Sequence, residues 1–114
     1  MISINKFRKL ALSFPEAMEE LHFEKASFRV KKKIFATYDE EKNIACIKLS
    51  QIDQHVFSKA GKLIIYPVEN KWGKQGWTII EMKNVNADLF TDALTTAYCE
   101  VAPKKLGTLV RQNY

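Results

Sequence analysis

Residues Ser27-Phe28-Arg29-Val30-Lys31-Lys32-Lys33-Ile34-Phe35-Ala36-Thr37-Tyr38 decide the fold of this chain. β-Branched and aromatic residues, which favour strands, lie on both sides of three consecutive lysines. Two strand-forming runs separated by so short a polar interruption predict a tight β-hairpin centred on the lysines. The fold is therefore expected to contain an antiparallel sheet that begins with this hairpin.

The sequence after the hairpin extends the sheet. The polar cluster at residues 39–43 predicts a second turn, and the apolar run at residues 44–49 predicts the third strand of a meander. Two further strands are expected at residues 63–66, where Pro67 ends the run, and at residues 77–82. The glycine-containing stretch at residues 70–76 between them is expected to be a loop.

Apolar residues at helical spacing predict helices before, between and after these strands. Ser3 is a plausible N-cap of a first helix, which should end near Ser13 or Phe14 because Pro15 follows. Residues 16–21 are expected to form a further acidic turn.

Ser50 is expected to begin a second helix that stops at Gly61, and Asn86 a long last helix that stops at Pro103. A short helical turn from Leu106 is expected to follow. The second helix is expected to bury the side chains of Ile52, Val56, Phe57 and Ala60. The core as a whole is expected to contain Phe7, Leu10, Phe28, Val30, Phe35, Ile47, Phe57, Ile64, Ile79, Phe90, Leu94 and Tyr98.

The order of elements is helix, three strands, helix, two strands, helix, which predicts the α+β class: an antiparallel sheet, a three-strand meander plus two further strands, packed against helices. The chain of 114 residues is 46% hydrophobic and 27% charged, so we assign residues 1–114 to a single globular domain rather than to a disordered or repetitive chain. No apolar run approaches the roughly 20 residues of a membrane span, and the N-terminus lacks a signal-peptide core. We expect a cytoplasmic protein with no membrane partner.

Cations are concentrated in the hairpin. The formal net charge of the chain is +5, which favours a polyanionic partner. Lys25, Arg29, Lys31, Lys32 and Lys33 fall within nine residues, and strand alternation would place Arg29, Lys31 and Lys33 on the face opposite Phe28 and Val30. Such a stripe either neutralises phosphates of nucleic acid or is a solvated strand face charged against aggregation.

A second cluster alternates cations with indoles. Lys71, Trp72 and Lys74 precede Trp77, an arrangement used to stack bases beside a backbone charge. Trp77 is expected to begin a strand and point into the core. Trp72 is equally consistent with packing under its loop or with exposure to solvent.

The sequence contains no pattern typical of a metal or catalytic site. His22 and His55 lack partners at ligand spacing and are expected to be surface or capping residues, while Cys46 and Cys99 are expected to be buried, unpaired small hydrophobes. The carboxylates of Glu16, Glu19, Glu20 and Glu24 superficially resemble the acidic helix of frataxin-type iron carriers, but the run spans a turn in a basic protein. We therefore expect no metal, no cofactor and no enzymatic activity.

Several short segments, in their order and spacing, resemble the MmcQ/YjbR-like family of small bacterial proteins. The segments are Pro15-Glu16, Phe28-Arg29-Val30, Lys33-Ile34-Phe35-Ala36, Gly76-Trp77, Ala97-Tyr98 and Pro103-Lys104-Lys105. The resemblance implies a CyaY-like fold, similar to a double-wing DNA-binding domain, and its members are labelled as DNA-binding. Ala97 replaces a serine that is frequent in the family, and Lys32 a glycine at the first hairpin.

Two functions are expected from these features. The first is a non-enzymatic, monomeric binding module for nucleic acid, above all DNA, which would use a basic sheet face and the Lys/Trp loop. Its expected contact residues are Lys25, Arg29, Lys31, Lys32, Lys33, Lys71, Trp72 and Lys74. The alternative is a protein- or small-ligand-binding adaptor that uses the Trp72 loop and an exposed sheet face.

Overall fold

The fold is a six-stranded antiparallel sheet with helices on one face, which confirms the predicted α+β class. The computed structural model describes residues 2–23 and 25–112. Its elements, in chain order, are α1 (Ile4–Ser13), β1 (Ala17–His22), β2 (Lys25–Val30), β3 (Lys33–Asp39), β4 (Ile44–Lys48), α2 (Gln51–Ala60), β5 (Ile65–Pro67), α3 (Lys71–Lys74), β6 (Trp77–Glu81), α4 (Ala87–Val101) and α5 (Lys104–Gln112).

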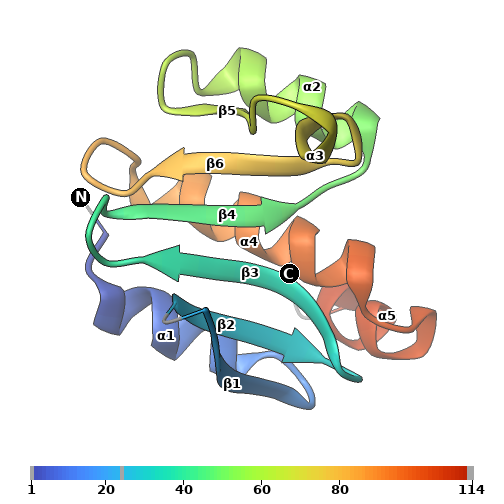
Figure 1. The fold of residues 1–114 in the computed structure, drawn as a ribbon. Helices are drawn as coiled ribbons and strands as arrows, with labels where there is room; N and C mark the ends of the chain where they lie inside the picture. The colour runs from blue at the N-terminus through green and yellow to red at the C-terminus, as the bar shows by residue number, and fades with distance from the viewer. Residues whose placement is uncertain (1, 24, 113–114) are drawn as a thin grey trace.

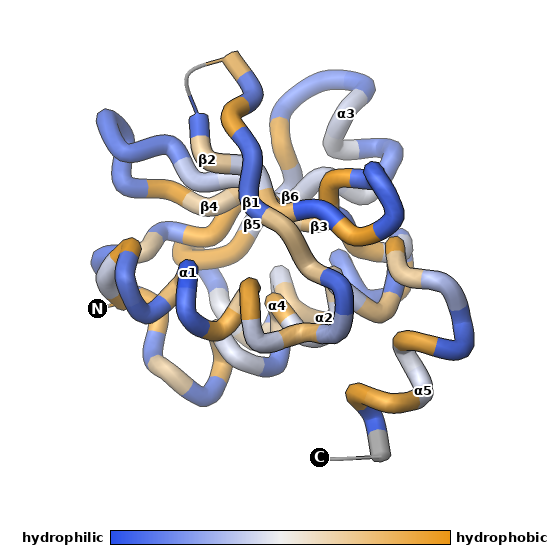
Figure 2. The backbone as a smooth tube through the Cα atoms, turned by 90° about the horizontal axis from the view of Figure 1, so that it is seen from below, coloured by the Kyte–Doolittle hydropathy of each residue, from blue (hydrophilic) through white to orange (hydrophobic). Residues whose placement is uncertain are grey.

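The strands lie side by side in the order β1-β2-β3-β4-β6-β5, and every neighbouring pair is antiparallel. Helices α1 and α4 lie behind the sheet in Figure 1, with α5 against α4 and α2 beside β5. Figure 2 shows the same helices together below the strands. The opposite face of the sheet, which these helices do not cover, is termed the open face.

The core lies between the sheet and the helices. Among the side chains predicted for it, those of Phe7, Phe28, Val30, Phe35, Ile47, Phe90, Leu94 and Tyr98 are buried. Leu10, Phe57, Ile64 and Ile79 are only half-buried. The predicted N-caps are confirmed, because Ser3 Oγ, Ser50 Oγ and Asn86 Oδ1 each accept a backbone N–H from the first turn of α1, α2 and α4. No helix in residues 2–23 and 25–112 is long and apolar enough to cross a membrane.

The predicted hairpin is confirmed, with a two-residue loop at Lys31 and Lys32. Both loop residues have positive φ, 50° and 70°, which gives the backbone twist that a two-residue hairpin prefers. Val30 and Lys33 are the last directly paired residues of the two strands. A register shift beside Phe28 and Arg29 leaves Phe35 as an extra residue in β3, so Phe35 and Ala36 are both buried despite being adjacent.

The predicted acidic turn at residues 16–21 is wrong, because this segment forms the edge strand β1. Strand β1 pairs with β2 along its whole length. Glu19 and Glu20 lie on opposite faces of the strand, and each finds a cation there: Glu19 pairs with Arg8 at 2.7 Å and Glu20 with Arg29 at 3.2 Å. Charged residues are common on edge strands, and these two glutamates interrupt the apolar pattern by which a strand is predicted.

The predicted buried face of α2 is also largely wrong. Ile52 and Val56 are 77% and 54% exposed, Ala60 is exposed, and Phe57 is half-buried. The inward position is taken by Gln54, whose Nε2 donates to the carbonyl of Gly73 and to Thr78 Oγ1. The helix therefore satisfies polar groups where its apolar spacing suggested hydrophobic packing.

Candidate binding groove on the open sheet face

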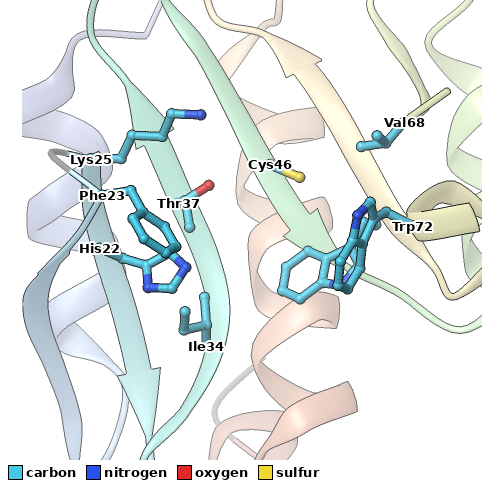
Figure 3. Close-up of a pocket in the computed structure, with 9 residues that line it drawn as sticks. His22, Phe23, Lys25, Ile34, Thr37, Cys46, Val68 and Trp72 are labelled. Atoms are coloured by element: carbon cyan, nitrogen blue, oxygen red, sulfur yellow. The ribbon is translucent and has the colours of Figure 1, made fainter. Parts of the chain in front are cut away.

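A groove of about 360 Å³ crosses the open face and is mostly apolar. The groove is defined by its lining side chains, which are His22, Phe23, Lys25, Ile34, Thr37, Cys46, Val68, Trp72 and Trp77. Strands β1 to β4 and β6 with their connections supply them, so the groove is formed by residues distant in sequence (Figure 3). Two of these lining side chains, Phe23 and Trp72, are exposed aromatic rings.

Two segments rise above the open face and form the walls. Figure 2 shows the end of β1 and α3 standing away from the sheet on the side opposite α1, α2 and α4. The first wall carries Phe23, 86% exposed, whose ring meets that of His22 edge-on at a centroid distance of 4.6 Å. The second carries Trp72, 49% exposed. Figure 3 shows Phe23 and Trp72 on opposite sides of the floor residue Cys46.

Local geometry fixes the α3 wall. Asn70 Oδ1 accepts the backbone N–H of Trp72 at 2.9 Å and begins the short helix. At Gly73, an added β-carbon would lie 1.9 Å from the carbonyl oxygen of Val68. At Gly76, φ is +106° and an added β-carbon would lie 1.8 Å from the carbonyl oxygen of Leu49. Both glycines therefore allow the loop to approach the neighbouring backbone more closely than any other residue would.

Side chains from the sheet and α2 fasten the same loop. Lys48 Nζ donates to the carbonyl of Gln75 at 2.5 Å, and Gln51 Nε2 donates to that of Lys74 at 3.0 Å. With the Gln54 bond to Gly73, three backbone carbonyls of the loop accept side-chain donors from outside it. Trp72 is thus presented by a segment that is ordered before any ligand arrives.

The floor of the groove is apolar, and its cysteine, Cys46, is a thiol near neutral pH. Ile34, Thr37 and Cys46 project from β3 and β4, and Thr37 and Cys46 are direct cross-strand partners. Burial raises the pKa of the Cys46 thiol to about 11, so it is protonated near neutral pH. The thiolate is the nucleophilic form of cysteine, and Cys46 therefore serves as an apolar surface.

The prediction that Trp77 points into the core is wrong. Its neighbours in β6, Thr78 and Ile80, are the residues with fully buried side chains. Alternation then places Trp77 on the open face, opposite Lys48 of β4, where it lines the groove. The two indoles of the chain thus belong to one site.

The predicted basic stripe is not a row of free cations. On the strands and their hairpin, Lys25 lies 3.5 Å from Asp39, and Lys31 lies 2.7 Å from Glu16. With the Arg29–Glu20 pair, three of the five cations have a carboxylate partner. Lys33 is the direct partner of the fully buried Val30, and directly opposed residues share a face, so Lys33 does not lie on the open face with Arg29.

The structure brings together only part of the predicted contact set. Lys25 and Trp72 line the groove. Lys71 lies beside it, with Nζ 5.7 Å from the centre of the Trp72 ring. Lys74 stands at the end of the same loop, whereas Arg29 and the hairpin lysines 31–33 are not among the groove-lining residues.

The carboxylates considered for iron are dispersed. Glu16, Glu19 and Glu20 each pair with a different cation, and Glu24 lies outside the described residues. Across residues 2–23 and 25–112, no three metal-ligating side chains come together.

Sequence reasoning missed the first wall of the groove. His22 and Phe23 follow the segment expected to be an acidic turn, and Val68 follows a proline whose predicted role was only to end a strand. The signal that was present is the aromatic pair His22-Phe23 beside the cation Lys25. Its meaning depends on β1 being a strand, because only then does the pair stand at the end of a hairpin on the open face.

Comparisons with known proteins agree with this architecture. The family model described as YjbR matches residues 12–100. The crystal structure of Deinococcus radiodurans protein DR2400, which carries the family-model domain DUF419, superposes with a TM-score of 0.79 at 20% sequence identity. The match covers 99% of this chain and 88% of that one. No curated protein matches the chain significantly.

Proposed function

The chain belongs to the YjbR family, and we propose that it is a non-enzymatic binding protein for nucleic acid whose contact surface is the groove on the open face. One observation carries this proposal: aromatic side chains from two separate walls flank an apolar floor, with the Lys25 side chain in the lining. Aromatic faces beside cations are the combination that binds bases together with their phosphates.

The exposure of the two walls supports a partner. Phe23 and Trp72 leave 86% and 49% of their area in contact with water, although burial of such rings stabilises a folded chain. Exposed aromatic side chains gathered around one depression are typical of an interaction site. The formal net charge of +5 favours a polyanion among the candidates.

The chemistry of the groove supports binding rather than catalysis. Cys46 lines the groove and could act as a nucleophile only as a thiolate, but its burial keeps it a protonated thiol near neutral pH. His22 contacts the ring of Phe23, and its function in the proposal is that of an aromatic surface. A site with an apolar floor flanked by aromatic side chains can hold a planar group without transforming it.

A fluorescence-anisotropy titration of a labelled mixed-sequence oligonucleotide at low salt tests the proposal. The wild type should bind at micromolar concentration or below, and Phe23→Ala should weaken binding because it removes one wall. Ile52→Ala is the matched control, since it removes an exposed apolar side chain from α2, away from the groove. Absence of binding by the wild type would overturn the proposal.

The size of the groove favours a second candidate, a small-ligand-binding adaptor. About 360 Å³ lies within the range of small-molecule sites, about 300–1,000 Å³. In that case a free planar aromatic compound, such as a nucleoside, should quench the tryptophan fluorescence on its own, and an oligonucleotide should bind no more tightly per base than the free compound.

A further inference from the structure

We infer that the groove accepts an unpaired nucleobase, so that the protein prefers single-stranded to double-stranded nucleic acid. This inference rests on the proposed function and specifies which form of nucleic acid the groove takes. It is carried by two independent features: how three cations of the predicted basic stripe are paired, and how aromatic rings are presented on the open face.

Three cations of the predicted basic stripe are poorly placed for duplex binding. Sequence-independent affinity for a duplex comes mainly from cations that neutralise phosphates and release counterions. Here Lys25 faces Asp39, Arg29 faces Glu20, and Lys31 faces Glu16, at 3.5, 3.2 and 2.7 Å. Each cation must leave a carboxylate before it gains a phosphate. The net electrostatic gain of these three cations on a duplex is therefore small.

The aromatic rings are well placed for an unpaired base. Base pairs in a duplex stack on one another, so their faces are not accessible to a side chain on the protein surface. A single strand exposes those faces, and each base that stacks on an aromatic side chain gains affinity irrespective of its identity. Trp72 and Phe23 offer exposed rings from opposite sides of one groove.

The wall that carries Trp72 also costs little to organise. The loop that carries Trp72 is fixed by the close approach of Gly73 and Gly76 to neighbouring carbonyls, and by donors from Lys48, Gln51 and Gln54. A ring that is already immobilised loses little conformational entropy when a base stacks on it. The Trp72 wall therefore adds little conformational-entropy cost of its own when a base binds.

The test compares one labelled oligonucleotide as a single strand and as a duplex with its complement, and adds a ribo-oligonucleotide of the same sequence. Each is titrated by fluorescence anisotropy against the wild type, Trp72→Ala, Trp72→Phe and the control Ile52→Ala. We expect the single strands, DNA or RNA, to bind about tenfold or more tightly than the duplex. Trp72→Ala should weaken single-strand binding about 5- to 100-fold and leave duplex binding nearly unchanged.

Two further readouts separate stacking from a folding defect. Trp72→Phe keeps an aromatic face and should restore most of the affinity, and the thermal unfolding midpoints of both Trp72 variants should remain near that of the wild type because Trp72 is half exposed. The salt dependence on single strands should be shallow, with a slope of about −1 to −2, since each phosphate contact contributes about −0.7.

The outcomes distinguish this inference from the proposed function. Equal or tighter binding of the duplex, with Trp72→Ala affecting both forms alike, would overturn single-strand preference and leave nucleic-acid binding intact. If neither form binds, the proposed function fails and the inference fails with it.

Discussion

The hydroxyl of Tyr98 in α4 donates a hydrogen bond of 2.7 Å to the carbonyl of Pro15, across 83 residues of sequence. The Tyr98 ring is fully buried and stacks on Phe14 at a centroid distance of 4.7 Å. The bond fastens the connection between α1 and β1 to the long helix. Pro15-Glu16 and Ala97-Tyr98, two of the segments that carry the resemblance to the family, thus meet at one point of the fold.

Replacing Tyr98 by phenylalanine should destabilise the protein by about 1 kcal/mol. The ring and its packing remain, so the loss reports the hydrogen bond to Pro15 and its unpaired carbonyl. Urea unfolding followed by circular dichroism measures it, and an unchanged m-value shows that the unfolded state is not altered. A loss below about 0.3 kcal/mol would mean that water replaces the hydroxyl without cost.

Alkaline pH should destabilise the protein progressively from about pH 9. Burial raises the pKa of Cys46 to about 11 and that of Tyr98 to about 12, and a hydrogen bond to Glu81 raises the pKa of Tyr66 to about 12. The folded state therefore retains protons that the unfolded state releases above about pH 9 for cysteine and pH 10 for tyrosine.

The sign follows from linkage. Where the folded state binds more protons, the free energy of unfolding falls as pH rises, so the stabilisation present below pH 9 is lost up to about pH 12. Unfolding in urea at several pH values between 8 and 12 measures this decline. Cys46→Ala should flatten its first part, between about pH 9 and 11, and a profile of unchanged shape in that variant would contradict the assignment.

The hairpin turn should be stabilised by glycine. Lys31 and Lys32 both have positive φ, which is unfavourable for a residue with a β-carbon. Lys32→Gly should raise the free energy of unfolding by about 1 kcal/mol. Lys32→Ala removes the same charge but keeps the β-carbon, so it should change stability little. Equal gains from both variants would show that relief of charge repulsion, and not backbone strain, is responsible.

Two glycine-to-alanine changes should have opposite effects. Gly76→Ala places a β-carbon 1.8 Å from the Leu49 carbonyl at a φ of +106°, and should cost about 2 kcal/mol or more. Gly107→Ala in α5 meets only ordinary contacts, the nearest at 3.8 Å, and should gain up to about 1 kcal/mol. Thermal unfolding of both variants measures the contrast. A stable Gly76→Ala protein would mean that the loop below Trp72 is free to shift.

Local signals predicted much of this fold. The N-caps Ser3, Ser50 and Asn86 and the lysine-centred hairpin depend on residues close together in sequence, and all were predicted. Strand β1 was missed because its acidic residues find their cations on α1 and β2, and neither contact is visible along the strand itself. The inward orientation of Gln54 likewise depends on carbonyls that a distant loop supplies.

The candidate site was less predictable than the fold. Lys25 and Trp72 were singled out, but the groove joins them to His22 and Phe23 only because β1 pairs with β2. The expected continuous stripe failed for a geometric reason. A two-residue turn makes Lys33 the partner of Val30, which carries it to the face of the core. Counting the alternation of strand residues through the turn would instead place Lys33 on the open face with Arg29.

Removing a carboxylate from the open face should strengthen binding to nucleic acid. Glu20→Gln releases Arg29 from its ion pair at 3.2 Å, so the guanidinium becomes available to a phosphate. Affinity at low salt should rise, and the salt slope on a single strand should steepen by about 0.7. Anisotropy titrations at several salt concentrations measure both quantities. Glu100→Gln makes the same change of net charge at an exposed position of α4, behind the sheet, and should leave the slope unchanged. Identical effects of the two variants would show that net charge alone acts, and that the Arg29–Glu20 pair does not restrain phosphate binding.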